Sequence, residues 1–132
     1  LGKVIASTSM IEYITQNADL LETIGIFFPF ILAAILKSAQ GSSTVALTTT
    51  AGIVAPILPV LGLDSPIRAT LAVMAIGAGA MTVSHANDSY FWVVTNFGAM
   101  TPEKGYKTQT MATLVLGISG MVEIFVLSLF LH

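Results

Sequence analysis

The charged residues of this chain are few and unevenly spaced, and their spacing constrains the fold more than any other feature. Five basic and seven acidic side chains make up 9% of the 132 residues, compared with about 25% in soluble domains. Residues 38–63 carry no charge at all. A continuous helix of that length, at about 1.5 Å per residue, would exceed the hydrocarbon core of a bilayer, which is about 30 Å thick. Each long gap between charges is therefore a predicted membrane segment.

The composition excludes several other classes of protein. With 55% hydrophobic residues, a water-exposed globule would leave large apolar patches on its surface. Disorder requires low hydrophobicity and high charge, and a disulfide scaffold requires cysteine, which this chain lacks. A net charge of −2 argues against a nucleic-acid surface. The chain begins at Leu1 in a moderately polar stretch, and we expect it to be a piece of a longer membrane protein.

Two apolar arms joined by a polar tip form the first unit, residues 20–63. The arms cover 20–36 and 43–60, with a kink expected at Pro29, and the tip 37–44 reads KSAQGSST. This pattern predicts a re-entrant helical hairpin, whose polar backbone is tolerated at membrane depth only inside protein or beside a wet cavity. Hydroxyl, amide and free N–H groups suit a carboxylate and a polyhydroxylated substrate. A loop outside the membrane is the alternative interpretation.

A second polar interruption divides residues 64–102, a predicted broken transmembrane helix. The unwound segment 84–89, SHANDS, lies between apolar runs, and half-helix ends in a membrane can bind ions. His85 and Asp88 are ionisable residues in an apolar context, which makes them candidates for a proton or ion relay. This segment has one His, one Asp and no Cys, which is too few ligands for a metal site. The same residues are weak evidence for a catalytic triad. We therefore expect that the protein binds no metal or cofactor and is not an enzyme. A short turn outside the membrane is the alternative.

The last segment, 103–132, contains the most regular predicted transmembrane helix, after a turn expected at 101–105. Lys104 and Lys107 form the only paired basic cluster, so the positive-inside tendency places this turn in the cytoplasm and the C-terminus outside. Residues 1–19 are expected to form a connecting or interfacial helix. The small residues 75–80, with Gly77 and Gly79, are expected to allow close helix packing.

Two motifs resemble a known family. Residues 37–46 (KSAQGSSTVA) and 84–92 (SHANDSYFW) are similar to segments of the gluconate permease family of bacterial proton symporters, within the wider ion-transporter superfamily. The likeness runs over essentially the whole chain and matches the C-terminal third of such a permease. It implies an all-α membrane protein with two inverted repeats, each with a re-entrant hairpin and a broken helix. This chain would supply the hairpin, the broken helix and the last transmembrane helix of the second repeat.

The resemblance also implies a function and a site. We expect proton-coupled, secondary active uptake of gluconate or a related sugar acid across the bacterial inner membrane. The protein would be multi-pass and homo-oligomeric, embedded in the lipid bilayer, and would need the N-terminal part of the transporter. Asp88 or His85 is expected to carry the proton, since a protonated carboxyl favours a nearby anion. The residues expected to bind the substrate are Ser38, Gln40, Gly41, Ser42, Ser43, Thr44, Asn87 and Ser89.

Three alternatives remain at this point. Within the same fold, the substrate could be D-serine or another small organic acid, because a hydroxyl-rich tip does not identify one. From a different class, the chain could be a small structural or channel subunit of a membrane complex. A soluble helical bundle is the third alternative.

Overall fold

The computed structural model describes residues 25–131, and every regular element in that range is a helix. The predicted all-helical class is confirmed for these residues. The predicted connecting helix 1–19 and the first residues of the hairpin, 20–24, lie outside the described range. The elements are α4 (Phe27–Gln40), α5 (Ser43–Val54), the 3-10 turn η1 (Ala55–Ile57), α6 (Pro66–Met81), α7 (Ser89–Phe97), α8 (Pro102–Gly105), the π-helical turn η2 (Tyr106–Thr110) and α9 (Met111–Phe130).

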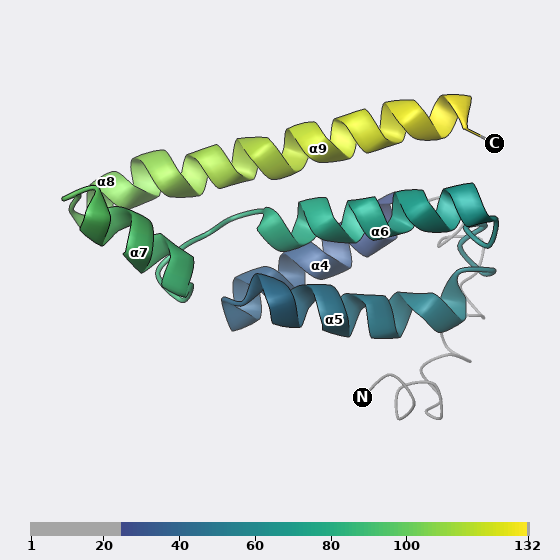
Figure 1. The fold of residues 1–132 in the computed structure, drawn as a ribbon, viewed down its shortest axis with the longest axis horizontal. Coiled ribbons are helices and arrows are strands. Elements are labelled where there is room, and N and C mark those ends of the chain that lie inside the picture. Colours follow the sequence, from purple (N-terminus) through teal and green to yellow (C-terminus); the bar gives the residue numbers. More distant parts are fainter. Residues whose placement is uncertain (1–24, 132) are drawn as a thin grey trace.

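Helix α6 is the centre of the bundle. It contacts α4, α5 and α9, while α7 and α8 lie together at one end of the molecule (Figure 1). Small residues permit this close packing, because a Cβ on Gly79 of α6 would overlap the carbonyl group of Phe30 in α4. The predicted close packing is therefore confirmed at Gly79, whereas Gly77 has open space beside it.

The turn between α4 and α5 is shorter than the predicted tip. Gly41 adopts a left-handed φ of 71° that ends α4, and Ser42 caps α5 by accepting a hydrogen bond from the Val45 N–H at 3.3 Å. Of the segment 37–44, only Gly41 and Ser42 are non-helical, because the residues before them complete the last turn of α4. The expected kink at Pro29 does not arise within α4, because this proline lies in the first turn, where its missing N–H has no helical partner to lose.

Residues 82–88 lead from the end of α6 to the start of α7 in an irregular conformation (Figure 1). Val83 takes a positive φ of 55°. Asp88 caps α7, because its Oδ1 accepts a hydrogen bond from the Tyr90 N–H at 3.0 Å. The non-helical segment thus begins two residues before the predicted 84–89, and Ser89 already belongs to α7. The position of this break within a membrane stays a prediction.

Helices α8, η2 and α9 form one continuous helix, Pro102–Phe130, of 29 residues. The predicted turn at 101–105 is wrong, because the Thr101 hydroxyl accepts a hydrogen bond from the Lys104 N–H at 3.3 Å and Pro102 takes the first helical position. Within residues 25–131, this is the one helix long and apolar enough to cross a membrane. Its apolar side chains are largely exposed, including Val115, Val122 and Leu129.

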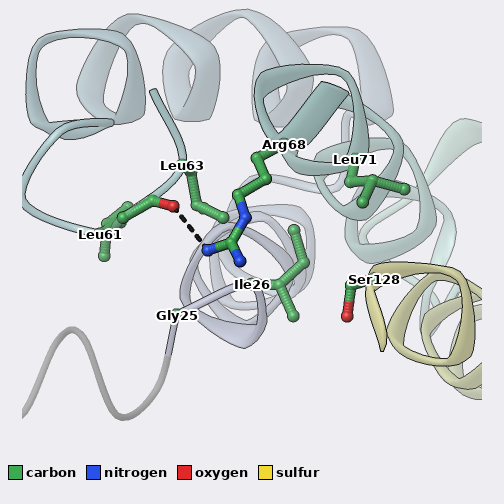
Figure 2. A pocket seen from close by; sticks show the side chains of 8 residues that line it. Gly25, Ile26, Leu61, Leu63, Arg68, Leu71 and Ser128 are labelled. Atoms are coloured by element: carbon green, nitrogen blue, oxygen red, sulfur yellow. Dashed lines mark hydrogen bonds between the residues drawn. The ribbon is translucent and has the colours of Figure 1, made fainter. Parts of the chain in front are cut away.

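A cavity of about 280 Å³ lies at the base of the α4–α5 pair, beside the end of α9 (Figure 2). Arg68 of α6 reaches into it and donates a hydrogen bond from Nη1 to the Gly62 carbonyl at 3.0 Å. Most of the other lining side chains are apolar, and Ser128 contributes a hydroxyl from α9. Both polar motifs lie at the opposite ends of α4 and α6, so this cavity is separate from them.

Candidate functional site

The two polar motifs meet at a smaller cavity, of about 140 Å³. It lies between the ends of α4 and α6, the starts of α5 and α7, and one face of α9. Its apolar lining is Met81 and Leu116. Its polar lining consists of Lys37, Ser43, Ser84, Asp88, Tyr90 and Thr113.

A buried ion pair joins the two motifs across this cavity. Lys37 Nζ lies 2.5 Å from Asp88 Oδ2, and the two side chains are only 2% and 6% exposed. The same ammonium group donates a hydrogen bond to the Gly41 carbonyl at 3.3 Å. Lysine and aspartate are almost never fully buried unless paired, and removing one partner of such a pair typically costs about 3–5 kcal/mol. The pair therefore ties the end of α4 to the start of α7.

Neutral groups hold the Asp88 carboxylate in one orientation. The Ser84 hydroxyl donates a hydrogen bond to Asp88 Oδ2 at 2.7 Å, and the Tyr90 N–H donates one to Asp88 Oδ1. Ser84 is itself held by the long helix, because its N–H donates to Thr113 Oγ1 of α9 at 2.9 Å and its carbonyl accepts from the hydroxyl of Thr110, the last residue of η2, at 2.6 Å. The irregular segment 82–88 is thus fixed at Ser84, four residues before the carboxylate, to the long helix Pro102–Phe130.

A second contact joins the motifs beside the ion pair. Asn87 Nδ2 donates a hydrogen bond to the Ser38 carbonyl at 2.6 Å. Gly41 lies directly against Asn87, where a Cβ would overlap the carbonyl oxygen. Since Gly41 also has a positive φ, both the conformation and the space at this position favour glycine.

The predicted site residues are divided between the cavity and its surroundings. Ser43 and Asp88 line the cavity, and Ser38, Gly41 and Asn87 form the contact between the motifs. The remaining predicted substrate residues do not line the cavity: Gln40, Thr44 and Ser89 are exposed, and the hydroxyl of Ser42 caps α5.

His85 lies next to the site without joining it. Its side chain is half-buried and makes no hydrogen bond to another described residue, although its carbonyl accepts from the Asp88 N–H at 2.8 Å. Ser84 reaches Asp88 directly, so His85 does not stand between a hydroxyl and a carboxylate as it would in a nucleophilic triad.

Four polar lining residues were not among the predicted site residues. Lys37 did carry a signal, because it is the only charge between positions 23 and 63, and a charge in an apolar segment requires a partner. Thr113 carried no such signal, because the hydroxyl of a threonine inside a helix usually donates a hydrogen bond to a backbone carbonyl of the same helix. The other two are Ser84 and Tyr90, at the edges of the predicted motif.

Comparison with known proteins identifies the family. Residues 1–130 match the family model described as GntP family permease. The chain belongs to this permease family. It is 40% identical over 106 residues to a gluconate permease of Pseudomonas aeruginosa, which covers 80% of this chain and 23% of the relative. It is also 33% identical over 121 residues to the inner membrane permease YgbN of Escherichia coli, covering 92% of this chain and 26% of the relative.

A relative named for another sugar acid is similar to the same degree. The Gnt-II system L-idonate transporter of Escherichia coli is 37% identical over 101 residues, which cover 76% of this chain and 22% of the relative. The chain spans about a quarter of the length of these three permeases. No solved structure gives a significant match.

Membership of the GntP permease family confirms the resemblance seen in the two motifs. It also confirms that the chain belongs with transport proteins and not with enzymes, since the relatives are permeases. Proteins of this kind act in membranes, in agreement with the apolar composition and the long helix Pro102–Phe130.

Proposed function

We propose that this chain is the C-terminal part of a secondary active transporter that carries a sugar acid, such as gluconate, into the bacterial cell together with protons. Its family and the names of its relatives support this proposal, since two of them are named for gluconate and L-idonate. The transporter would be a multi-pass protein of the inner membrane and a homo-oligomer. D-serine or another small organic acid is the alternative substrate.

The same proposal assigns a role to each part of the bundle. Helices α4 and α5 would form the re-entrant hairpin of the second inverted repeat, and α6 and α7 the two halves of its broken transmembrane helix. The last transmembrane helix would be α9. The ends of four helices meet at the smaller cavity, and converging half-helix ends are the usual place for substrate and coupling ions in transporters.

The observation that carries the proposal is the buried pair of Lys37 and Asp88 beside a cavity lined by hydroxyl groups. A carboxylate that gains and loses a proton changes the charge of this enclosed site by one unit. A change of charge at the site alters its affinity for an anion, and by linkage the anion alters the affinity for the proton. Asp88 is therefore the proposed proton carrier, with His85 as the second candidate.

The experiment is uptake of labelled gluconate into proteoliposomes that contain the complete permease, with and without an inward proton gradient. We expect the gradient to drive accumulation in the wild type. Asp88→Asn cannot exchange a proton at this position, so its accumulation should fall to the level seen without a gradient. Asp64→Asn is the matched control, because Asp64 is exposed and lies outside the site, and it should accumulate gluconate as the wild type does.

The two parts of the proposal fail in different ways. Undiminished accumulation by Asp88→Asn would show that another group carries the proton, and His85→Gln would then be measured in the same assay. A wild type that does not transport gluconate would leave the family intact and direct the assay to other small organic acids, D-serine first.

A further inference from the structure

Lys37 is a buried positive charge that stability alone does not explain. Its side chain is 2% exposed and lines the smaller cavity together with Asp88. A buried ion pair is often no more stabilising than well-packed apolar residues in its place. In a membrane protein, a charge at such a position is a reason to look for a ligand of opposite charge.

The ammonium group of Lys37 has a donor left over. It has three N–H donors, and within residues 25–131 it makes two hydrogen bonds, to Asp88 Oδ2 at 2.5 Å and to the Gly41 carbonyl at 3.3 Å. Because Lys37 and its partner Asp88 both line the cavity, the third donor can serve a molecule bound there.

The start of α5 supplies further donors on the same cavity wall. Ser43 is the first residue of this 12-residue helix and lines the cavity. Helix geometry leaves the first N–H groups without an intrahelical acceptor, and the positive end of the helix dipole favours an anion there. A carboxylate between Lys37 and Ser43 would therefore meet a full positive charge and free N–H donors.

The rest of the cavity suits a hydroxylated carbon chain. Ser84, Tyr90 and Thr113 present hydroxyl oxygens, which can accept hydrogen bonds. The protons of Ser84 and Thr113 are already donated, to Asp88 Oδ2 and to the Thr110 carbonyl. Met81 and Leu116 present apolar surface for the carbon atoms. The lining thus has a cationic end that suits the carboxylate of a sugar acid and a neutral polar end that suits its hydroxyl groups.

We propose that Lys37 binds the carboxylate of the transported acid, and that Asp88 forms its ion pair with Lys37 only while no acid is bound. This inference rests on the proposed function, the uptake of a sugar acid with protons. When Asp88 takes up a proton, its attraction for Lys37 is lost and the ammonium group becomes free for the carboxylate of the substrate. The site then exchanges one buried anion for another.

The charge balance of the site agrees with this exchange. The empty site holds one positive and one negative charge, and the loaded site holds the ammonium group, a neutral Asp88 and the carboxylate of the acid. Lys37 of α4 and Tyr90 of α7 are the titratable groups that border the cavity with Asp88, and His85 precedes Asp88 in the same segment. The lining residues from α5, α6 and α9 are uncharged. One proton and one carboxylate can thus enter together without a net change in buried charge.

The test is binding of labelled gluconate to the purified complete permease, with gluconamide, its uncharged amide, as competitor. The wild type should prefer gluconate. The double variant Lys37→Gln/Asp88→Asn replaces the ion pair by two neutral side chains of similar size, so no buried charge is left unpaired. Its affinity for gluconate should fall by about tenfold or more, since a hydrogen bond to a charged group is lost, whereas its affinity for gluconamide should change little.

Two single variants complete the design. Asp88→Asn keeps Lys37 and should keep the preference for gluconate, but gluconate binding should no longer weaken as the pH rises, because no proton has to be taken up at this position. Lys37→Arg keeps a positive charge and should also keep the preference. Lys104→Gln is the control, because this lysine is exposed on α8, and it should bind both compounds as the wild type does.

The outcomes separate this inference from the proposed function. If the wild type binds gluconate and the double variant retains the same preference over gluconamide, Lys37 is not the carboxylate site, while transport of a sugar acid still stands. Loss of the preference in Lys37→Arg would also count against the inference, whether or not the double variant folds. A wild type that binds neither compound overturns the proposed function and this inference with it.

Discussion

At the residue scale, the site depends on a few positions where one type of side chain fits and others do not. Lys37 and Asp88 neutralise each other in a place that admits little water. Gly41 provides both a left-handed turn and the close approach of Asn87. A charge in an apolar segment and a glycine in a polar tip are both visible in the sequence, but neither shows which residue will lie opposite.

Replacing Gly41 should damage the contact between the motifs. In Gly41→Ala, a methyl group would overlap the Asn87 carbonyl in a backbone conformation that alanine rarely adopts. We expect a loss of about 1–3 kcal/mol from overpacking alone, and a lower temperature of thermal unfolding in the purified permease. Gly77→Ala is the matched control, because nothing lies within 4 Å of the added methyl group, and alanine in a helix should leave the protein equally or more stable. Equal effects of the two substitutions would contradict this account of Gly41.

At the scale of the elements, the helices begin at polar residues that cap them. Ser42, Ser65, Asp88 and Thr101 each accept a hydrogen bond from an N–H group in the first turn that follows. Such caps are readable from sequence, because they depend on near neighbours. The length of the polar tip was overestimated because Lys37–Gln40 continue α4. Lys37 gains burial and its bond to Asp88 by doing so, and that contact lies outside any local pattern.

The contact of α9 with the α6 end should depend on Gly117. A Cβ at this position would overlap the Thr82 hydroxyl, whereas a Cβ on Gly120 would meet Ala78 at an ordinary 3.5 Å. Gly117→Ala should therefore push the two helices apart and lower stability by about 1–3 kcal/mol, while Gly120→Ala should be close to neutral. Thermal unfolding of the two variants in the same detergent measures the difference. A Gly117→Ala protein as stable as Gly120→Ala would show that the helices adjust without cost.

At the scale of the whole molecule, α9 borders both the cavity with the ion pair and the cavity with Arg68. Thr113 lines the cavity with the ion pair, and Ser128 lines the cavity with Arg68 at the other end. Fifteen residues of helix separate them, which corresponds to about 22 Å. The two polar regions therefore lie at different heights along the helix that is long enough to cross a membrane.

The ends of the long helix should lie on opposite sides of the membrane. The chain contains no cysteine, so single cysteines at Lys104 and Leu131 can be labelled with a membrane-impermeant maleimide, in a permease from which any other cysteines have been removed. We expect labelling of Leu131→Cys in intact cells and of Lys104→Cys only after permeabilisation, because Lys104 and Lys107 favour the cytoplasmic side. Labelling of both positions from outside would exclude a transmembrane α9 with this orientation.

The sequence by itself determined the helical class, the membrane character and the family. These follow from composition, from the spacing of charges and from two motifs, all of which are properties of the chain that need no knowledge of contacts. The tertiary structure alone decided that Lys37 meets Asp88, 51 positions away, and that Thr113 of α9 completes the cavity. Those contacts depend on how closely α4, α6 and α9 approach one another, which small residues such as Gly79 and Gly117 permit. Packing between distant segments, and not local propensity, turned two polar interruptions into one site.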